Sequence, residues 1–324
     1  MNPMNFTTEV EAANALQADY QKLTAEIRKK IYGQDEIIKK VLISIFSNGH
    51  CLLVGVPGLA KTLLVNTISQ VLDLNYQRIQ FTPDLMPSDI IGTEILNNER
   101  KFTFIKGPLF ANILLADEIN RTPPKTQSAL LEAMQEQMVT VNGKSYQIKK
   151  PFFVLATQNP IEQEGTYPLP EAQLDRFMFS IYLDYPKIED ELAIVENTTS
   201  GKEIVLDKIM SADQILYYQK LIQKVPINRN VLEYAVHLAA KTRPNTEHSH
   251  KMANEYVNWG AGPRASQYLV IGAKTNALLS GKYSPDIEDV KEVAVSILRH
   301  RIIKNYKAEA EGISIEDIIQ ELLK

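Results

Sequence analysis

The chain has 324 residues, of which 44% are hydrophobic and 23% charged, and these fractions are typical of a globular protein rather than a disordered or fibrous one. Its 39 acidic and 35 basic residues leave a net charge of −4, so the strongly basic overall footprint of many nucleic-acid-binding proteins is absent. The single cysteine, Cys51, excludes internal disulfides and a cysteine-rich zinc site.

Two further features bear on location. No run of residues approaches the roughly 20 apolar positions that a membrane-spanning helix needs. The segment Met1–Lys30 lacks the basic and then apolar regions of a secretory signal. Together with the single cysteine, these features favour a cytoplasmic protein without a membrane span.

The N-terminal part predicts two helices and a strand. Thr8 and Glu11 have the spacing of a capping box, and apolar residues follow on one face, so a helix is expected over Thr8–Ile31. A second helical stretch runs to Phe46. The apolar run His50–Val54 is bounded by glycines and predicts a short buried strand, after which a helix begins near residue 60.

Three more short apolar runs predict buried strands, and they are Ile113–Ala116, Phe152–Ala156 and Met178–Leu183. The stretch Tyr76–Phe81 is a further predicted strand. With the first strand they make five, and helical stretches separate them along the chain. This alternation is typical of a parallel α/β sheet covered by helices.

Two segments alternate like β-hairpins instead. The first, Gly92–Lys106, has Asn97-Asn98 as its candidate turn, and the second, Val139–Ile148, has the strong turn signal Asn142-Gly143. Both interrupt the alternation of strands and helices, so both are expected to be insertions that decorate the sheet.

After Pro186 the pattern becomes helical. The predicted helices are Glu189–Asn197, Ala212–Val225, Arg229–Arg243, Arg264–Lys282, Ile287–Tyr306 and Ile315–Leu323, with a polar loop over Pro244–Lys251. We therefore predict an α/β domain over residues 1–186 and an all-helical domain over residues 187–324.

The sharpest local motif lies between the first strand and the helix after it. It reads Gly55-Val56-Pro57-Gly58-Leu59-Ala60-Lys61-Thr62. In a P-loop of this kind, backbone N–H groups and the helix dipole attract phosphate oxygens. Lys61 is expected to reach the β- and γ-phosphates and Thr62 to bind Mg²⁺. The strict motif has Gly at position 60, and Ala60 fits it if its φ and ψ are already helical.

A pair of acids ends the strand at residues 113–116. Asp117 lies where a carboxylate would hold Mg²⁺ opposite Thr62. Glu118 is then the natural general base, or the group that orients the attacking water. Acids also end many buried strands simply because the chain returns to solvent, but the P-loop upstream favours the catalytic interpretation.

Three more polar residues are candidates for the same site, each with a plainer alternative. Asn159 ends another predicted strand and would bond the attacking water or the γ-phosphate, or it is a turn residue before Pro160. Arg176 is a surface arginine or a finger inserted into a neighbour's nucleotide site. Arg264 opens a helix and would touch the γ-phosphate from the helical domain, or it is an exposed first-turn residue.

This set of features resembles the MoxR family of AAA+ ATPases. The stretches that carry the resemblance are residues 55–62, Phe81–Asp89, Asp117–Gln127, Ala156–Pro160, Leu169–Phe177 and Gly262–Ala265. The resemblance extends over about residues 30 to 310. It implies a P-loop NTPase core with a parallel five-stranded sheet, a helix-2 insert at 92–106, a pre-sensor hairpin at 139–148, and an all-α lid.

The resemblance also implies roles for individual residues. Lys61 and Thr62 match Walker A, Asp117 and Glu118 match Walker B, Asn159 matches sensor 1, Arg176 the arginine finger and Arg264 sensor 2. The residues expected to contact the nucleotide are Gly55 to Leu63 (Gly55, Val56, Pro57, Gly58, Leu59, Ala60, Lys61, Thr62 and Leu63), Gly33 and Gln34 near the adenine, Asp117 and Arg264.

The implied function is ATP hydrolysis with ATP and Mg²⁺, coupled to chaperone-like remodelling or maturation of partner proteins. The implied assembly is a homo-oligomeric ring, a hexamer by resemblance, that acts on client proteins together with a partner bearing a von Willebrand factor A domain. Two alternatives stay open at this point: a nucleic-acid-associated AAA+ motor and a non-catalytic scaffold gated by nucleotide.

Overall fold

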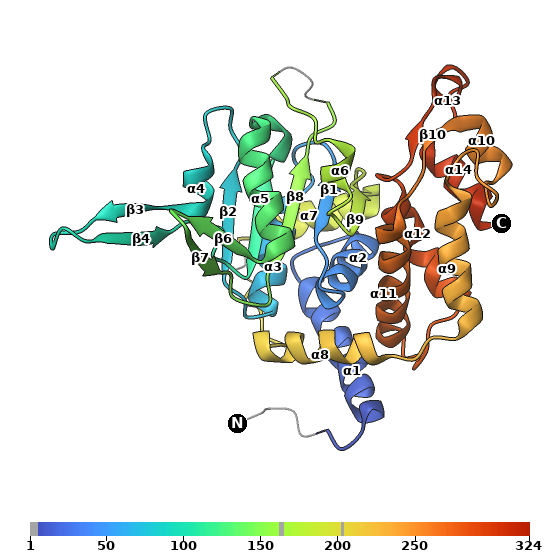
Figure 1. Cartoon of the computed structure of the whole chain (residues 1–324). Helices are drawn as coiled ribbons and strands as arrows, with labels where there is room; N and C mark the ends of the chain where they lie inside the picture. Colours follow the sequence, from blue (N-terminus) through green and yellow to red (C-terminus); the bar gives the residue numbers. More distant parts are fainter. Residues whose placement is uncertain (1–5, 162–164, 202–203) are drawn as a thin grey trace.

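The computed structural model describes residues 6–161, 165–201 and 204–324, and its centre is a five-stranded parallel sheet (Figure 1). In spatial order the strands are β2 (Tyr76–Gln80), β5 (Ile113–Asp117), β8 (Phe153–Gln158), β1 (Cys51–Val54) and β9 (Phe179–Tyr182). All four pairings are parallel, which confirms the predicted α/β sheet.

Burial explains why these segments form strands. All five residues of the inner strand β5 are buried, and β8 is buried except at its last residue. The edge strand β2 fully buries only Ile79 and exposes the polar residues Gln77, Arg78 and Gln80. Continuous apolar runs therefore occupy the middle of the sheet, as expected where helices cover both faces.

In residues 6–161 and 165–186, six helices and a 3₁₀ turn accompany the sheet. They are α1 (Glu9–Ile27), α2 (Asp35–Phe46), α3 (Lys61–Val71), α4 (Pro87–Ile91), η1 (Ile119–Arg121), α5 (Pro124–Glu136) and α6 (Glu171–Leu174). The predicted cap of α1 is present, because the Thr8 side chain accepts the Glu11 N–H at 3.1 Å. That helix ends at Ile27 rather than at the predicted Ile31.

Both predicted hairpins are present. The first consists of β3 (Gly92–Leu96) and β4 (Phe102–Lys106) and projects from the body of the molecule (Figure 1). The second consists of β6 (Met138–Val141) and β7 (Lys144–Gln147), and its turn residues Asn142 and Gly143 both have positive φ. A ring stack between Phe104 and Tyr146, with centroids 4.1 Å apart, joins the hairpins.

The C-terminal part is a helical lid with one small sheet. Its helices are α7 (Ile188–Thr199), α8 (Ala212–Lys224), α9 (Arg229–Lys241), α10 (Lys251–Tyr256), α11 (Pro263–Leu279), α12 (Ile287–Leu298), α13 (Tyr306–Ala310) and α14 (Ile315–Leu323). The sheet pairs β10 (Val257–Trp259) with β11 (Ile303–Lys304).

The prediction of one helix over residues 287–306 is therefore wrong at its C-terminal end. Helix α12 stops at Leu298, and the chain then forms β11. The apolar residues Ile302 and Ile303 continue a spacing that favours a helix. Antiparallel pairing with β10, which is distant in sequence, overrides that local preference.

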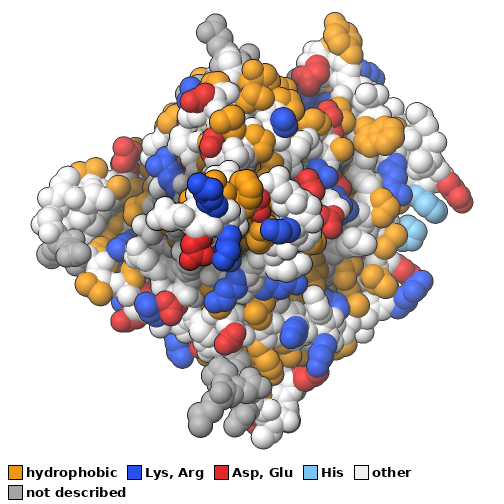
Figure 2. Space-filling view, turned by 60° about the vertical axis from the view of Figure 1, so that its left-hand side comes forward, with side chains coloured by type: hydrophobic (Ala, Val, Ile, Leu, Met, Phe, Trp, Pro, Cys, Tyr) orange, Lys and Arg blue, Asp and Glu red, His pale blue; other side chains and the backbone are white. Residues whose placement is uncertain are grey.

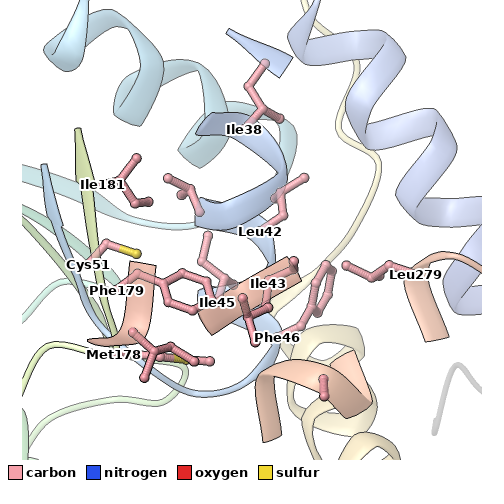
Figure 3. Close-up of a cluster of buried hydrophobic side chains, with 14 of the residues drawn as sticks. Ile38, Leu42, Ile43, Ile45, Phe46, Cys51, Met178, Phe179, Ile181 and Leu279 are labelled. Carbon is pink, nitrogen blue, oxygen red and sulfur yellow. The ribbon is translucent and has the colours of Figure 1, made fainter. Parts of the chain in front are cut away.

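Helix α2 lies between the sheet and the lid. Figure 3 shows Ile38, Leu42 and Phe46 of this helix in a buried cluster with Phe179 of the sheet and Leu279 of α11. The hydrophobic core thus continues from the sheet into the lid.

The predicted domain boundary at Pro186 falls between β9 and α7 and stays a prediction. Residues 1–5 and 162–164 of the predicted first domain lie outside the described part of the chain. In that part, no helix is long and apolar enough to cross a membrane.

Candidate functional site

The loop between β1 and α3 has the shape of a phosphate cradle. Gly58 has φ 89°, and a Cβ placed there would meet nothing within 4 Å, so the loop is open on this side. A Cβ on Gly55 would lie 2.9 Å from the Leu183 Cβ, which requires glycine at the start of the loop. The strand, loop and helix follow one another as the sequence predicts.

Lys61 reaches back over this loop. Its Nζ donates to the main-chain carbonyl of Gly55 at 2.6 Å. Burial lowers the pKa of the Lys61 ammonium, while the nearby Asp117 and Glu118 carboxylates act in the opposite direction. The cation is therefore held between the loop and the acid pair, where it could bind a phosphate oxygen.

Asp117 ends β5 with only 9% of its surface exposed. Its Oδ1 accepts a hydrogen bond from the Thr157 hydroxyl at 2.6 Å. Its Oδ2 accepts from Arg78, at 2.6 Å from Nη2 and 3.1 Å from Nε. A carboxylate has about four acceptor positions, so one on Oδ1 is left for a metal ion or its water.

Glu118 follows with a left-handed backbone, at φ 56° and ψ 50°. Its Oε2 accepts hydrogen bonds from Gln80 Nε2 at 2.7 Å and from Arg121 Nη1 at 3.0 Å. The Gln80 amide is itself oriented, because its Oε1 accepts from Arg78 Nη2 at 2.9 Å. Arg78 and Gln80 of β2 thus connect the two acids.

Arg78, Gln80 and Thr157 contact the acid pair but are not among the site residues that the sequence predicts. The available signal was a pair of polar residues two positions apart in the predicted strand 76–81, since side chains at i and i+2 share one face of a strand. These two residues reach the acid pair because β2 pairs with β5, in a register that puts Gln80 opposite Asp117.

The carboxyl ends of neighbouring strands bring the predicted residues to one edge of the sheet. The Gly55 N–H donates to the Gln158 carbonyl at 3.1 Å, which joins the P-loop to the end of β8. Asn159 comes next, is buried, and accepts the Ile161 N–H through Oδ1 at 3.2 Å. The P-loop, the acid pair and Asn159 therefore lie together.

Arg176 lies at the other end of the strands, where β1 and β9 begin. It comes just before β9, and the Met178 N–H donates to the carbonyl of His50, the residue before β1. Its own Nε donates to Gln135 Oε1 at 3.1 Å. Since a four-residue strand spans about 13 Å, the length of β9 separates Arg176 from the edge that holds the P-loop.

Arg264 is on the same side as Arg176. Its Nη1 donates to Asp175 Oδ2 at 2.9 Å, and both arginines line a cavity of about 220 Å³ with Tyr268. The structure does not bring Arg264 to the P-loop of its own chain. Its predicted contact with a γ-phosphate remains a prediction.

The turn before α2 packs against the P-loop. Gln34 Nε2 donates to the Leu59 carbonyl at 3.3 Å, and Gln34 Oε1 is a buried acceptor without a hydrogen-bond partner. Gly33 has φ 69°, and a Cβ there would lie 2.4 Å from the Asp190 carboxyl carbon of α7. A buried, unused acceptor beside the loop fits a site that receives a ligand.

Comparison with known proteins decides the family. The chain is 43% identical over 300 residues to the chaperone MoxR1 of Mycobacterium tuberculosis, which covers 92% of this chain and 79% of MoxR1. The chain belongs to the MoxR family of AAA+ ATPases. The resemblance inferred from the sequence is confirmed.

Other relatives agree with this assignment. The protein MoxR of Methylorubrum extorquens is 28% identical over 309 residues, covering 89% of this MoxR-family chain and 90% of the relative. The crystal structure of a protein from Cytophaga hutchinsonii has a TM-score of 0.91 at 46% identity, and the match covers 97% of this chain and 96% of the other.

Two family matches divide along the fold. Residues 50–179 match the ATPase family associated with various cellular activities (AAA), and residues 249–322 match the AAA lid domain. The P-loop, the acid pair, Asn159 and Arg176 lie in the first match, and Arg264 lies in the second. The predicted P-loop core with a helical lid is confirmed.

Ala60 departs from the condition stated for it. Its φ of 55° and ψ of 22° are left-handed rather than helical, a conformation that costs a residue with a Cβ about 1 kcal/mol or more.

We expect Ala60→Gly to raise the free energy of unfolding by about 0.5–1 kcal/mol, as measured by denaturant titration. Ala18, exposed within α1, provides the control, because Ala18→Gly should lower it by about 1 kcal/mol. Equal losses in both variants would contradict strain at Ala60.

Proposed function

We propose that this MoxR-family chain hydrolyses ATP in a Mg²⁺-dependent reaction and uses the energy to remodel or mature partner proteins. The observation that carries the proposal is the gathering of the P-loop, Lys61 and the acids Asp117 and Glu118 at one edge of the sheet. The chaperone name of the relative MoxR1 supports the second half of it.

The residues present fit ATP with Mg²⁺. The cradle is open at Gly58, the Lys61 cation faces it, and Gln34 offers an unused buried acceptor on the adenine side. A Mg²⁺ ion bound with a nucleotide takes few protein ligands, such as one hydroxyl and one carboxylate, together with phosphate oxygens. Thr62 and Asp117 would hold it, and it would neutralise charge on the phosphates.

The chemistry of the chain's own residues follows from this arrangement. Lys61 would exchange the Gly55 carbonyl for phosphate oxygens and stabilise their charge. Glu118 would take the proton of the attacking water, and Asn159 would orient that water or the γ-phosphate. In the structure Gln80 and Arg121 hold the Glu118 carboxylate, so the base must be released from these partners, or turned, before it acts.

A ring completes the site in this proposal. Arg176 and Arg264 both lie at the amino ends of the strands, and the P-loop of their own chain lies at the carboxyl ends. A nucleotide that Arg176 stabilises would therefore belong to a neighbouring subunit. Helix α7 has no buried residue and exposes Ile188, Leu192 and Val195 on one stripe. An apolar stripe of this kind, next to the Gly33 turn, supports a subunit contact near the nucleotide.

The projecting hairpin β3–β4 is the surface that we propose for partner proteins. It exposes Leu96 and Phe102, with 69% of Phe102 accessible. The Phe104–Tyr146 stack joins it to the second hairpin, β6–β7, so a movement of one hairpin would displace the other. A partner with a von Willebrand factor A domain, a hexameric ring and a cytoplasmic location remain parts of this proposal that rest on the family and the sequence.

A nucleic-acid motor has less support. On the face in Figure 2, Lys and Arg side chains are interspersed with Asp, Glu and hydrophobic side chains rather than gathered in one basic patch. The net charge of −4 also lacks the strongly basic balance of many nucleic-acid-binding proteins. Stimulation of hydrolysis by DNA would reverse this preference.

Capture of partners tests the remodelling half of the proposal. Glu118→Gln loaded with ATP should retain partner proteins that Lys61→Ala does not retain, with mass spectrometry as the readout. A retained enzyme, purified, should gain activity on incubation with the wild-type chain and ATP, and not with ADP. If no protein is retained in an ATP-dependent way, or if no retained protein changes, the remodelling role is contradicted.

A further inference from the structure

One buried hydroxyl contacts both acids of the pair. Thr157 lies in β8 with 0% of its surface exposed. Its Oγ1 donates to Asp117 Oδ1 at 2.6 Å and accepts the Glu118 N–H at 2.8 Å. The hydroxyl therefore donates to the last residue of β5, Asp117, and accepts from the residue that follows the strand, Glu118.

These two bonds act on geometry that is otherwise unfavourable. Glu118 has a left-handed backbone, which residues other than Gly, Asn and Asp seldom adopt unless their surroundings fix it. The Thr157 hydroxyl fixes the amide at the start of that residue. It also fixes the Asp117 oxygen opposite the one held by Arg78, so the carboxylate cannot rotate freely.

We propose that Thr157 is a positioning residue for ATP hydrolysis. Its hydroxyl sets the orientation of the Asp117 carboxylate and the backbone turn that directs Glu118. It also ties both acids to β8, the strand that ends next to Asn159. A change at the tip of β8 is thus transmitted to both acids through one hydroxyl. This inference rests on the proposed ATPase function.

A structural role alone predicts a different outcome. A buried hydroxyl that only satisfies backbone groups contributes to folding, and its removal lowers stability wherever it lies. Thr242 offers a matched case in the lid. It is also 0% exposed, donates to the Ala239 carbonyl at 2.6 Å and accepts the Ala261 N–H at 2.8 Å. It contacts neither acid.

The test compares Thr157→Val, Thr157→Ser and Thr242→Val in the full chain. For each variant, kcat and KM for ATP are measured with Mg²⁺, the Kd of a non-hydrolysable ATP analogue is measured by calorimetry with and without Mg²⁺, and the unfolding midpoint is recorded. Thr157→Val should lower kcat at least tenfold, lose part of the gain in analogue affinity that Mg²⁺ gives, and keep the metal-free Kd within about threefold.

The two comparison variants should behave differently. Thr157→Ser keeps the hydroxyl and should retain kcat within about threefold, whereas Thr242→Val should lower the unfolding midpoint and leave kcat unchanged. If Thr157→Val is destabilised like Thr242→Val but has the wild-type kcat and the wild-type Mg²⁺ effect on binding, Thr157 is structural only and the inference fails.

Two arrangements keep the outcome interpretable. If Thr157→Val does not fold, Thr157→Cys replaces it, since a thiol is a weak donor, and its kcat should fall below that of Thr157→Ser; an equal kcat would overturn the inference. The proposed function fails separately, if the wild-type chain does not hydrolyse ATP or if Glu118→Gln hydrolyses it normally.

Discussion

Glu118→Gln is expected to abolish ATP turnover while leaving ATP binding intact. The amide has nearly the shape of the carboxylate and still offers an oxygen to Gln80 and Arg121, the partners seen in the structure. It cannot accept the proton of the attacking water, and a positioned general base contributes about 10²–10⁴-fold to a rate. We therefore expect kcat to fall at least a hundredfold in a phosphate-release assay, with the Kd for ATP changed by less than about threefold.

Glu132 provides the matched control for this substitution. It lies exposed on α5 and is not part of the candidate site, so Glu132→Gln should hydrolyse ATP at the wild-type rate. If Glu118→Gln and Glu132→Gln have equal kcat values, Glu118 does not act as the base. If Glu118→Gln loses ATP affinity along with turnover, the residue contributes to binding instead.

Local motifs explain why much of the site was predictable. The P-loop, the acid pair and Asn159 each follow an apolar run, and the carboxyl ends of parallel strands share one edge of a sheet. Their positions after predicted strands are therefore enough to predict that these groups lie together. The turn at Asn142-Gly143 was equally local, because its two residues adopt positive φ without outside help.

The parts that escaped prediction depend on contacts between distant segments. Arg78 and Gln80 matter because β2 pairs with β5, in a register that puts Gln80 opposite Asp117. The spacing of residues along the chain does not specify which strands are neighbours in the sheet. The end of α12 is similar, since β11 forms only because β10 lies beside it. The left-handed backbone of Ala60 is a third case, as the residue type alone favours a helix.

The positions of Arg176 and Arg264 relative to the P-loop also depend on the tertiary structure. From sequence, Arg176 was a candidate finger for a neighbour's nucleotide site, and Arg264 a candidate for contact with a γ-phosphate from the helical domain, each with a plainer surface alternative. The structure puts them at the amino ends of the strands, around one cavity with Asp175 and Tyr268 nearby. An arginine there serves a nucleotide only across a subunit contact. Repeated head-to-tail contacts that close produce a ring.

Arg176→Ala is accordingly expected to lower kcat by about 10³-fold, the lower end of the effect of an arginine finger, and the loss should be repaired by a subunit with the opposite defect. Lys61→Ala removes the phosphate-binding cation but leaves Arg176 in place. In rings mixed at equal amounts, an active contact needs an intact P-loop beside an intact finger, which random assembly gives at about a quarter of contacts.

Mixing the two inactive variants should therefore restore about a quarter of the wild-type rate in a phosphate-release assay, with native mass spectrometry to verify mixed rings. Activity should follow the product of the two fractions and peak at equal amounts. An arginine that acted within its own chain would give no restoration at any ratio, because each Arg176→Ala subunit would have a defective site regardless of its neighbour. Mixed rings without activity would thus show that Arg176 acts on the nucleotide of its own chain or on none. That result would contradict the inference drawn from the length of β9, which separates Arg176 from its own P-loop.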